Sequence, residues 1–344
     1  MQAALVTGKR QITLRDMPEP EPSAGKAVVE IAYCGICGTD LHAWASGAPY
    51  NPAICGHEWS GTLAKRGAGI SHLKEGDRVT IGIGPACGQC ADCRSGRGAY
   101  CSTAFTGVLG MGPLAAPHGG FARAIAIDAS RLVVVRAGIS DEAAAMLEPA
   151  TVALHAVRRT PLRLGDACVV LGAGPIGLLT QQCALAAGAG AIVVVEPHPV
   201  RRAKAKQLGA SAVIDPKTED VAARVKEVLG PFGADVVFEC AGIPQTIDQA
   251  ASLAKRGGVV SLVGLANVPA TITPGTWIVN EIRLSASLAY LNEEFDLTMG
   301  LVQDGRLKLG PVHTKTVGIN EMDAAFALLN DNPAEIKILV RPRG

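Results

Sequence analysis

Residues 167–196, ACVVLGAGPIGLLTQQCALAAGAGAIVVVE, decide the fold of the second half of the chain. Five mainly apolar residues come first, G-x-G-x-x-G follows at 172–177, and a second apolar run ends at Glu196. Glycines at this spacing allow a tight turn and bring backbone N–H groups and a helix N-terminus towards a pyrophosphate. The order of strand, glycine turn, helix, strand and acid therefore predicts a dinucleotide-binding βαβ unit.

The lack of charged side chains over 167–195 would also suit a membrane span. The glycines and Pro175 would break a single spanning helix, so a buried strand–turn–helix–strand unit is favoured. The same rhythm continues along the chain and predicts further strands at 212–214, 235–239, 259–263 and 283–288. Together these give the six strands that a doubly wound parallel sheet requires, in an α/β protein.

The residues around the end of the second strand, 191–195, indicate which dinucleotide is bound. Glu196 would accept hydrogen bonds from the adenosine ribose and repel a 2′-phosphate, which favours NAD over NADP. Arg201 and Arg202 favour NADP instead, so the preference for NAD is not strict on this ground. The phosphate-binding turn itself would be formed by Gly172, Gly174, Pro175 and Gly177.

The first 82 residues follow a different pattern, in which short β-rich runs such as 27–32 and 78–83 alternate with Pro/Gly turns. This pattern predicts a β-rich, barrel-like domain. After Tyr290 we expect amphipathic helices at 293–303 and 320–329, and then a strand at 336–340 that returns to the first domain. We therefore expect a catalytic domain over 1–152, completed by 290–344, and a coenzyme domain over 153–289.

Four cysteines crowd into residues 87–101, at positions 87, 90, 93 and 101. Two consecutive C-x-x-C steps (Cys87, Cys90, Cys93) wrap one metal ion, and Cys101 returns the fourth thiolate. Disulfides across such short loops would be strained. Four thiolates leave no open position, so a structural zinc is predicted. A nucleic-acid zinc ribbon is disfavoured, because the segment has few basic residues and no aromatic platform.

A second group of potential metal ligands lies upstream, in CGICGTDLH (34–42) and CGHE (55–58). Zinc accepts mixed sulfur, nitrogen and oxygen ligands, and a catalytic zinc keeps one position open for water or substrate. Cys37 or His57 alone would be read as a core residue. Together, and flanked by glycines that let the backbone approach closely, they favour a catalytic metal site.

Glu148 lies in an apolar neighbourhood, where a carboxylate is costly unless it is paired or bound to metal. It is a candidate further zinc ligand, or a base close to the metal. The run that begins at Asp141 is expected to form a helix that Pro149 stops.

Composition excludes other classes of function. The chain has 344 residues, enough for two domains, and a net charge of +1, which gives no electrostatic footprint for nucleic acid or an anionic membrane. The N-terminus has no basic region followed by an apolar run, so no signal peptide is expected. Cysteines spaced for metal binding in a chain of this length indicate a reducing, cytoplasmic location.

These residues together resemble the zinc-containing medium-chain alcohol dehydrogenase family, and the resemblance covers nearly the whole chain. The motifs that carry it are GICGTDLH (35–42), GHE (56–58), the four cysteines and the glycine turn. Similarity to the polyol and butanediol branch comes from EPATVALHAV (148–157), FECAG (238–242) and SLAY (287–290). The resemblance implies a GroES-like catalytic domain, a Rossmann domain, two zinc ions per subunit, and a homodimer or homotetramer.

The resemblance also implies roles position by position. Cys37 and His57 match zinc ligands, and Glu58 and Glu148 match carboxylates that bind or exchange on the metal. Thr39 matches the hydroxyl that takes the substrate proton, and His42 the histidine that passes it to solvent. The implied nucleotide and nicotinamide contacts are Ile176, Glu196, Arg201, Val263, Leu265, Leu288 and Tyr290. Aromatic residues near these motifs are candidates for the walls of the pocket: Trp44, Tyr50, Phe105 and Tyr290.

Two positions depart from the family pattern. Gly38 stands where liver-type enzymes carry a basic residue on the pyrophosphate, and Ala289 stands where sorbitol dehydrogenases carry an arginine that holds the polyol. The second departure favours a small secondary alcohol or vicinal diol, 2,3-butanediol-like, over a long polyol. Sorbitol/polyol dehydrogenase and threonine 3-dehydrogenase remain alternatives. A non-catalytic dinucleotide-binding protein and a metal-stabilised interaction module are alternatives of other classes.

Overall fold

The computed structural model describes residues 1–47, 55–108, 111, 114, 116 and 118–343, and the chain divides into two compact units. Unit 1 comprises Met1–Glu148, Leu291–Met299 and His313–Gly344, and unit 2 comprises Pro149–Tyr290 and Gly300–Val312. The sequence predicts that all of 290–344 completes the first domain, whereas the segment Gly300–Val312 belongs to unit 2. Within unit 2 the side chain of Gln182 binds this segment: it accepts a hydrogen bond from the Lys308 N–H (2.7 Å) and donates one to the Lys308 carbonyl (3.2 Å).

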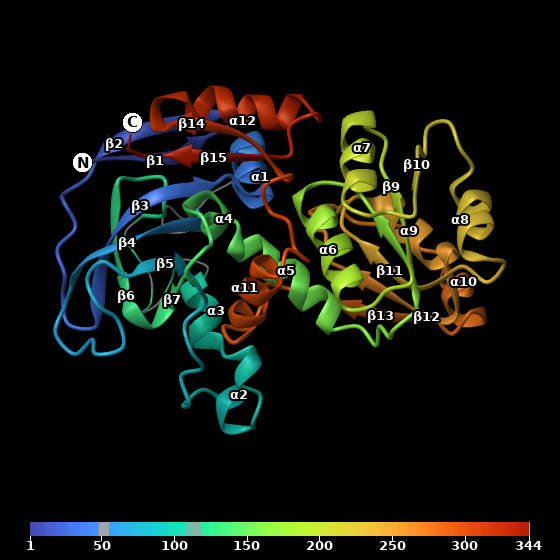
Figure 1. Cartoon of the computed structure of the whole chain (residues 1–344), viewed down its shortest axis with the longest axis horizontal. Helices are drawn as coiled ribbons and strands as arrows, with labels where there is room; N and C mark the ends of the chain where they lie inside the picture. The colour runs from blue at the N-terminus through green and yellow to red at the C-terminus, as the bar shows by residue number, and fades with distance from the viewer. Residues whose placement is uncertain (48–54, 109–110, 112–113, 115, 117, 344) are drawn as a thin grey trace. The chain divides into compact units, whose positions relative to one another are not determined.

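Unit 1 is β-rich (Figure 1). In the part of the chain that the structure describes, its main sheet has seven strands in the order β14-β15-β3-β4-β5-β7, with β6 also paired to β3. The pairs are antiparallel except β14–β15, and the last strand pairs with β3, as the sequence predicts for a chain end that returns to the first domain. The strands are β1 Gln2–Gly8, β2 Gln11–Asp16, β3 Lys26–Gly35, β4 Glu58–Arg66, β5 Arg78–Ile81, β6 Ala124–Asp128, β7 Leu132–Val134, β14 His313–Gly318 and β15 Lys337–Arg341.

Short helices connect and cover these strands. Aromatic residues pack in the core beneath these helices. The ring centroids of Trp44 and Phe326 lie 5.9 Å apart, and those of Phe326 and Phe121 lie 6.1 Å apart. Trp44 is therefore a core residue, not the pocket wall that its place beside the metal motif indicated. The helices are α1 Gly38–Ser46, α2 Ala91–Arg94, α3 Ser102–Val108, α4 Asp141–Ala145, α11 Glu294–Gln303 (which runs on into unit 2) and α12 Met322–Asp331.

Unit 2 is a parallel sheet with α6 and α7 on one face and α8, α9 and α10 on the other (Figure 1). Within the described ranges the sheet has six strands in the order β10-β9-β8-β11-β12-β13, which is the doubly wound order with β8 as its first strand. Its central strands are apolar because both faces are buried. The strands are β8 Ala167–Leu171, β9 Ala191–Val195, β10 Ala212–Ile214, β11 Ala234–Glu239, β12 Ala254–Leu262 and β13 Arg283–Ala286.

The helices of unit 2 contain one departure from expectation. Pro149 does not end a helix: it lies in the first turn of α5, Leu147–Arg158, where a backbone N–H has no partner within the helix. The break comes instead at Met146, the C-cap of α4. None of the helices among the described residues is long and apolar enough to cross a membrane. The remaining helices are α6 Pro175–Ala186, α7 Pro199–Gln207, α8 Val221–Leu229, α9 Pro244–Leu253 and α10 Pro274–Val279.

Candidate functional site

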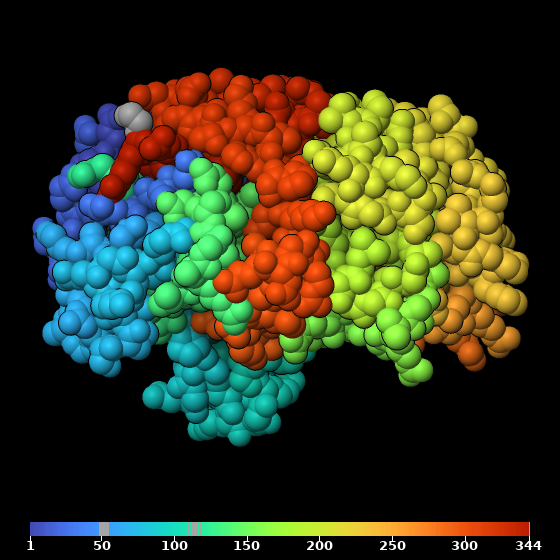
Figure 2. All heavy atoms as spheres, in the orientation of Figure 1, coloured from blue at the N-terminus to red at the C-terminus, as the bar shows by residue number. Residues whose placement is uncertain are grey.

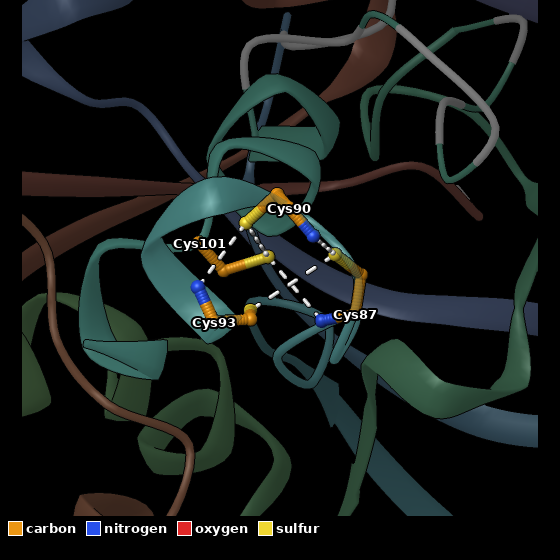
Figure 3. Close-up of side chains that lie close together, drawn as sticks. All are labelled: Cys87, Cys90, Cys93 and Cys101. Atoms are coloured by element: carbon orange, nitrogen blue, oxygen red, sulfur yellow. Dashed lines mark hydrogen bonds between the residues drawn. The ribbon is translucent and has the colours of Figure 1, made fainter. Parts of the chain in front are cut away.

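The four cysteines of 87–101 converge in a lobe of unit 1 (Figure 3), which protrudes as a knob in the space-filling view (Figure 2). The Sγ atoms of Cys87 and Cys93 lie 4.0 Å apart, and those of Cys90 and Cys101 lie 3.9 Å apart. A tetrahedral zinc with Zn–S distances of about 2.3 Å requires S···S separations of roughly 3.8 Å. The lobe therefore has the geometry of a closed four-thiolate zinc site.

Hydrogen bonds from surrounding N–H and O–H groups lower the pKa values of two of the thiols, Cys87 and Cys90, whereas burial raises the pKa of Cys93. A hydrogen bond from the Thr103 hydroxyl, together with those from the backbone N–H groups of Gln89 and Cys90, lowers the pKa of Cys87 to about 6. Cys90 is the N-cap of α2 and accepts a hydrogen bond from the Cys93 N–H. A thiolate is the form that binds zinc.

We expect replacement of Cys90 by serine to cost stability more than chemistry. The variant should carry one zinc ion fewer per chain, and its Tm should fall by about 10 °C, because a structural zinc contributes folding free energy of several kcal/mol. Zinc content and thermal unfolding measure both effects. Ser95→Ala, an exposed position of the same lobe, is the control. An unchanged zinc content in Cys90→Ser would contradict the assignment.

The second group of ligands is brought together by the pairing of β3 with β4. The register places Gly35 opposite Glu58, so that Cys37, just past β3, meets His57, just before β4. A ligand atom from each of Cys37, His57 and Glu58 lies within 4.8 Å of the others. Among the described residues, Glu148 is not one of those whose ligand atoms lie within 4.8 Å of one another. It is nevertheless close enough for its negative charge to raise the pKa of His57.

Asp40 holds these two segments together, a role that the sequence analysis missed. Its carboxylate is fully buried and accepts hydrogen bonds from the N–H of Cys37 (2.9 Å) and of Gly56 (3.3 Å). Its carboxylate also lies 4.0 Å from Nδ1 of His57, where its negative charge favours the protonated form of the ring. The signal was present: an acid three residues after the helix N-cap Cys37 forms a capping box.

Lys337 is the second missed residue. Its amine, on β15, is buried; it forms an ion pair with Glu58 and donates a hydrogen bond to the Ile36 carbonyl (2.9 Å). Burial alone would lower the pKa of Lys337, but the charges of Glu58, Cys37 and Glu148 raise it above its ordinary value. A lysine within the apolar run IKILV gave no sequence signal for a role beside Glu58, since lysine in a strand commonly faces solvent.

The electrostatics of this group suit a cation. Burial lowers the pKa of His57, yet the negative charges of Cys37, Asp40 and Glu148 outweigh it and raise the pKa well above its ordinary value. Thiolate, imidazole and carboxylate donors in one small region are ligands that zinc accepts. The residues present therefore fit a zinc ion.

The two residues expected to move the substrate proton lie on α1. The Thr39 hydroxyl is 3.6 Å from Sγ of Cys37. His42 is exposed and lies three residues further along the helix, hence on the same face. Of the remaining aromatic candidates, Phe105 on α3 is substantially exposed, Tyr290 is buried in unit 2, and Tyr50 lies outside the described residues.

The glycine turn in unit 2 joins β8 to the N-terminus of α6. Gly172 donates to the Val195 carbonyl (2.8 Å), and Gly174 is the helix N-cap, followed by Pro175 and Ile176 in the first turn. A Cβ atom on Gly177 would lie 1.9 Å from the Gly172 carbonyl oxygen, so the helix can approach the strand only with glycine here. The free N–H groups of this helix end can bind phosphate.

Glu196, at the end of β9, is fixed beside this turn. Its two carboxylate oxygens accept hydrogen bonds from the N–H groups of Ala173 and His198, each 2.8 Å long. Each oxygen retains a lone pair that a ribose hydroxyl can use. Burial lowers the pKa of Arg201 below its ordinary value, and the nearby charge of Glu196 offsets only part of this effect. Arg202 pairs with Asp215 (2.9 Å).

The other residues expected near the nicotinamide follow β12 and β13. The Val263 N–H donates to the Glu239 carbonyl (2.9 Å), and Leu265 and Leu288 are exposed. Their loops leave the carboxyl end of the sheet, where ligands of doubly wound folds bind.

Comparison with known proteins agrees with this geometry. Residues 23–137 match the model of the alcohol dehydrogenase GroES-like domain, and residues 175–304 match that of the zinc-binding dehydrogenases. The chain is 33% identical to (R,R)-butanediol dehydrogenase of Bacillus subtilis over 99% of its own length and 100% of the relative's. It is 33% identical to the Bacillus subtilis sorbitol dehydrogenase over 77% of its own length and 75% of the relative's.

A solved structure supports the same relationship. The crystal structure of 2R,3R-butanediol dehydrogenase from Bacillus subtilis superposes with a TM-score of 0.86 at 31% identity, and 99% of each chain is covered. Both units of the present chain thus have counterparts in one enzyme. The chain therefore belongs to the zinc-binding medium-chain dehydrogenases, and it is a zinc-dependent alcohol/polyol dehydrogenase, an oxidoreductase that acts on CH–OH groups.

Proposed function

We propose that this enzyme interconverts a small secondary alcohol or vicinal diol, such as 2,3-butanediol, and the corresponding ketone, with NAD(H) as the coenzyme. The observation that carries the proposal is the grouping of Cys37, His57 and Glu58 within 4.8 Å, with the Thr39 hydroxyl beside Cys37. The group provides a cation site and a proton acceptor in one place. Oxidation of a carbinol needs both.

Cys37 and His57 would hold the zinc ion, with Glu58 as third donor and Glu148 as an exchanging one. When bound, the ion would supply a Lewis acid that lowers the pKa of the alcohol hydroxyl. Asp40 fixes both ligand segments through the backbone N–H groups of Cys37 and Gly56, and its negative charge lies 4.0 Å from the imidazole of His57. The Thr39 hydroxyl would accept the substrate proton as it donates its own to the ribose of the coenzyme, and the exposed ring of His42 would take the proton from the ribose and release it to solvent. The second zinc of the proposal belongs to the four-cysteine lobe and has no part in the chemistry.

The coenzyme in this proposal is bound by unit 2, and its nicotinamide supplies the hydride acceptor. The helix end at Gly174–Gly177 would receive the pyrophosphate, and Glu196 the adenosine ribose. The buried carboxylate of Glu196 would also repel a 2′-phosphate, so we propose NAD over NADP. Ile176, Arg201 and the loops with Val263, Leu265, Leu288 and Tyr290 complete the proposed contacts.

A small substrate is favoured by one residue in particular. Ala289 provides no cationic group where the sorbitol dehydrogenases, by family resemblance, carry an arginine. Similarity to a butanediol dehydrogenase over the whole chain supports the same choice. Sorbitol and related polyols are the second candidate, because the sorbitol dehydrogenase is equally identical over the part it covers.

We also propose that the enzyme is a homodimer or homotetramer of the cytoplasm. β13 is an edge strand of the sheet in unit 2, and apolar side chains on it and on α10 are exposed, including Leu284, Ile278 and Val279. Exposed apolar edges of this kind mark association surfaces. A reducing compartment would keep the thiolates of both zinc sites available.

A substrate panel tests the proposal. The zinc-loaded enzyme is assayed with NAD and with NADP on stereoisomers of 2,3-butanediol, simple secondary alcohols, sorbitol and threonine, with and without a chelator. We expect the highest kcat/KM with a small diol and NAD, and loss of turnover with the chelator. A higher kcat/KM on sorbitol or threonine would overturn the substrate assignment.

A further inference from the structure

Glu239 is a fully buried carboxylate that none of the roles above uses. It ends β11, which lies beside β8 in the middle of the parallel sheet. One of its oxygens, Oε1, accepts three hydrogen bonds, from the N–H groups of Ala241 and Gly242 (2.9 Å each) and from the Thr246 hydroxyl (2.8 Å). A buried carboxylate is costly unless it is strongly bonded, so its position here calls for an explanation.

The turn that Glu239 holds, residues 240–242, is packed between the two loops expected to bind coenzyme. A Cβ atom on Gly172, in the glycine turn, would lie 3.1 Å from the Cβ atom of Ala241. A Cβ atom on Gly264, in the loop after β12, would lie 2.3 Å from the Gly242 nitrogen. The backbone of the turn is therefore in close contact with both loops.

Backbone hydrogen bonds extend this arrangement. The carbonyl of Glu239 accepts from the N–H groups of Val263 (2.9 Å) and Gly264 (2.8 Å), and the N–H of Cys240 donates to the Leu171 carbonyl (2.9 Å). Leu171 directly precedes the glycine turn that is proposed to bind phosphate. Val263 and Gly264 belong to the loop that is proposed to lie near the nicotinamide. Movement of the 240–242 turn would consequently shift both loops.

We propose that Glu239 is a positioning residue for the coenzyme: its carboxylate fixes the 240–242 turn and thereby sets the separation of the Gly172 turn and the Val263–Leu265 loop. The inference rests on the proposed function, in that these loops bind NAD. A charged acceptor suits the position because Thr246 lies in the first turn of α9, where the helix dipole favours a negative group. Hydrogen bonds to a carboxylate are also about twice as strong as neutral ones.

The test compares Glu239→Ala and Glu239→Gln with the unmodified enzyme. NADH affinity is measured by fluorescence, and KM is measured for NAD and, at saturating NAD, for the best alcohol of the panel. We expect Glu239→Ala to weaken NADH binding about tenfold, the loss that follows from removing hydrogen bonds to a charged group. Glu239→Gln keeps an accepting oxygen and should weaken binding only about threefold. The alcohol KM and the zinc content should not change.

Asp248→Asn is the matched control, since this carboxylate lies on the same helix and accepts a hydrogen bond from the Thr273 N–H (2.9 Å). It should leave NADH affinity unaltered. If Glu239→Ala does not fold, Glu239→Gln decides the question. Normal NADH affinity in Glu239→Gln, or an equal rise in alcohol KM, would overturn the inference. Failure of the unmodified enzyme to bind NADH would instead overturn the proposed function.

Discussion

Replacement of Cys37 by alanine is expected to reduce kcat by about 1000-fold or more, because the loss of a zinc ligand removes Lewis-acid stabilisation worth several kcal/mol. The fold should survive. The hydrogen bond to the Asp40 carboxylate comes from the backbone N–H of Cys37, which alanine also has, so the variant retains this link between the N-terminus of α1 and the metal site. Steady-state kinetics, zinc content and circular dichroism of the purified variant measure the three quantities.

Cys183→Ala is the matched control for this experiment. Cys183 is a buried thiol on α6 of unit 2 and takes no part in either cysteine-containing metal group. Its replacement should leave kcat and zinc content unchanged, so that an effect of Cys37→Ala reports on the ligand and not on thiol removal in general. Near-normal turnover by Cys37→Ala with a full complement of zinc would show that the assigned site is wrong.

The parts of the structure that could be predicted are those specified by local sequence. β8 and β9 span the residues that their apolar runs predict, 167–171 and 191–195, because a strand buried on both faces leaves an unbroken apolar run. The four-cysteine lobe was predictable for a similar reason: its ligands lie within fifteen residues, so their spacing alone describes a closed loop around one ion.

The parts that escaped prediction depend on contacts between distant residues. Lys337 pairs with Glu58 because β15 pairs with β3. A local sequence pattern cannot predict a partner that lies almost 280 positions away. The sequence predicts that Pro149 ends a helix, whereas it lies in the first turn of α5, because proline is disfavoured inside a helix but tolerated in its first turn. Trp44 follows the ligand motif closely, but the opposite face of α1 packs on α12, which carries it into the core.

Replacement of Lys337 by methionine is expected to lower the free energy of unfolding by about 3–5 kcal/mol, the usual effect of removing one partner from a buried ion pair. Both side chains are 3% exposed, so water cannot compensate the carboxylate of Glu58. The Ile36 carbonyl would lose its hydrogen bond from the amine as well. Methionine has a volume close to that of the lysine stem, so a cavity contributes little to the change. Denaturant unfolding of the purified enzyme gives the value.

A double-mutant cycle separates the charge from the packing at this position. If the instability of Lys337→Met comes from an uncompensated carboxylate, adding Glu58→Gln should restore much of the lost stability, since the amide is neutral. Lys315→Met, an exposed lysine on the neighbouring strand β14, is the control and should remain within about 0.5 kcal/mol of the unmodified enzyme. Equal stabilities for Lys337→Met and Lys315→Met would show that the pair with Glu58 contributes nothing. If Lys337→Met loses much stability and Glu58→Gln does not restore it, the loss comes from the missing Ile36 hydrogen bond and from packing. Glu58 would then not need the amine of Lys337 for its stability.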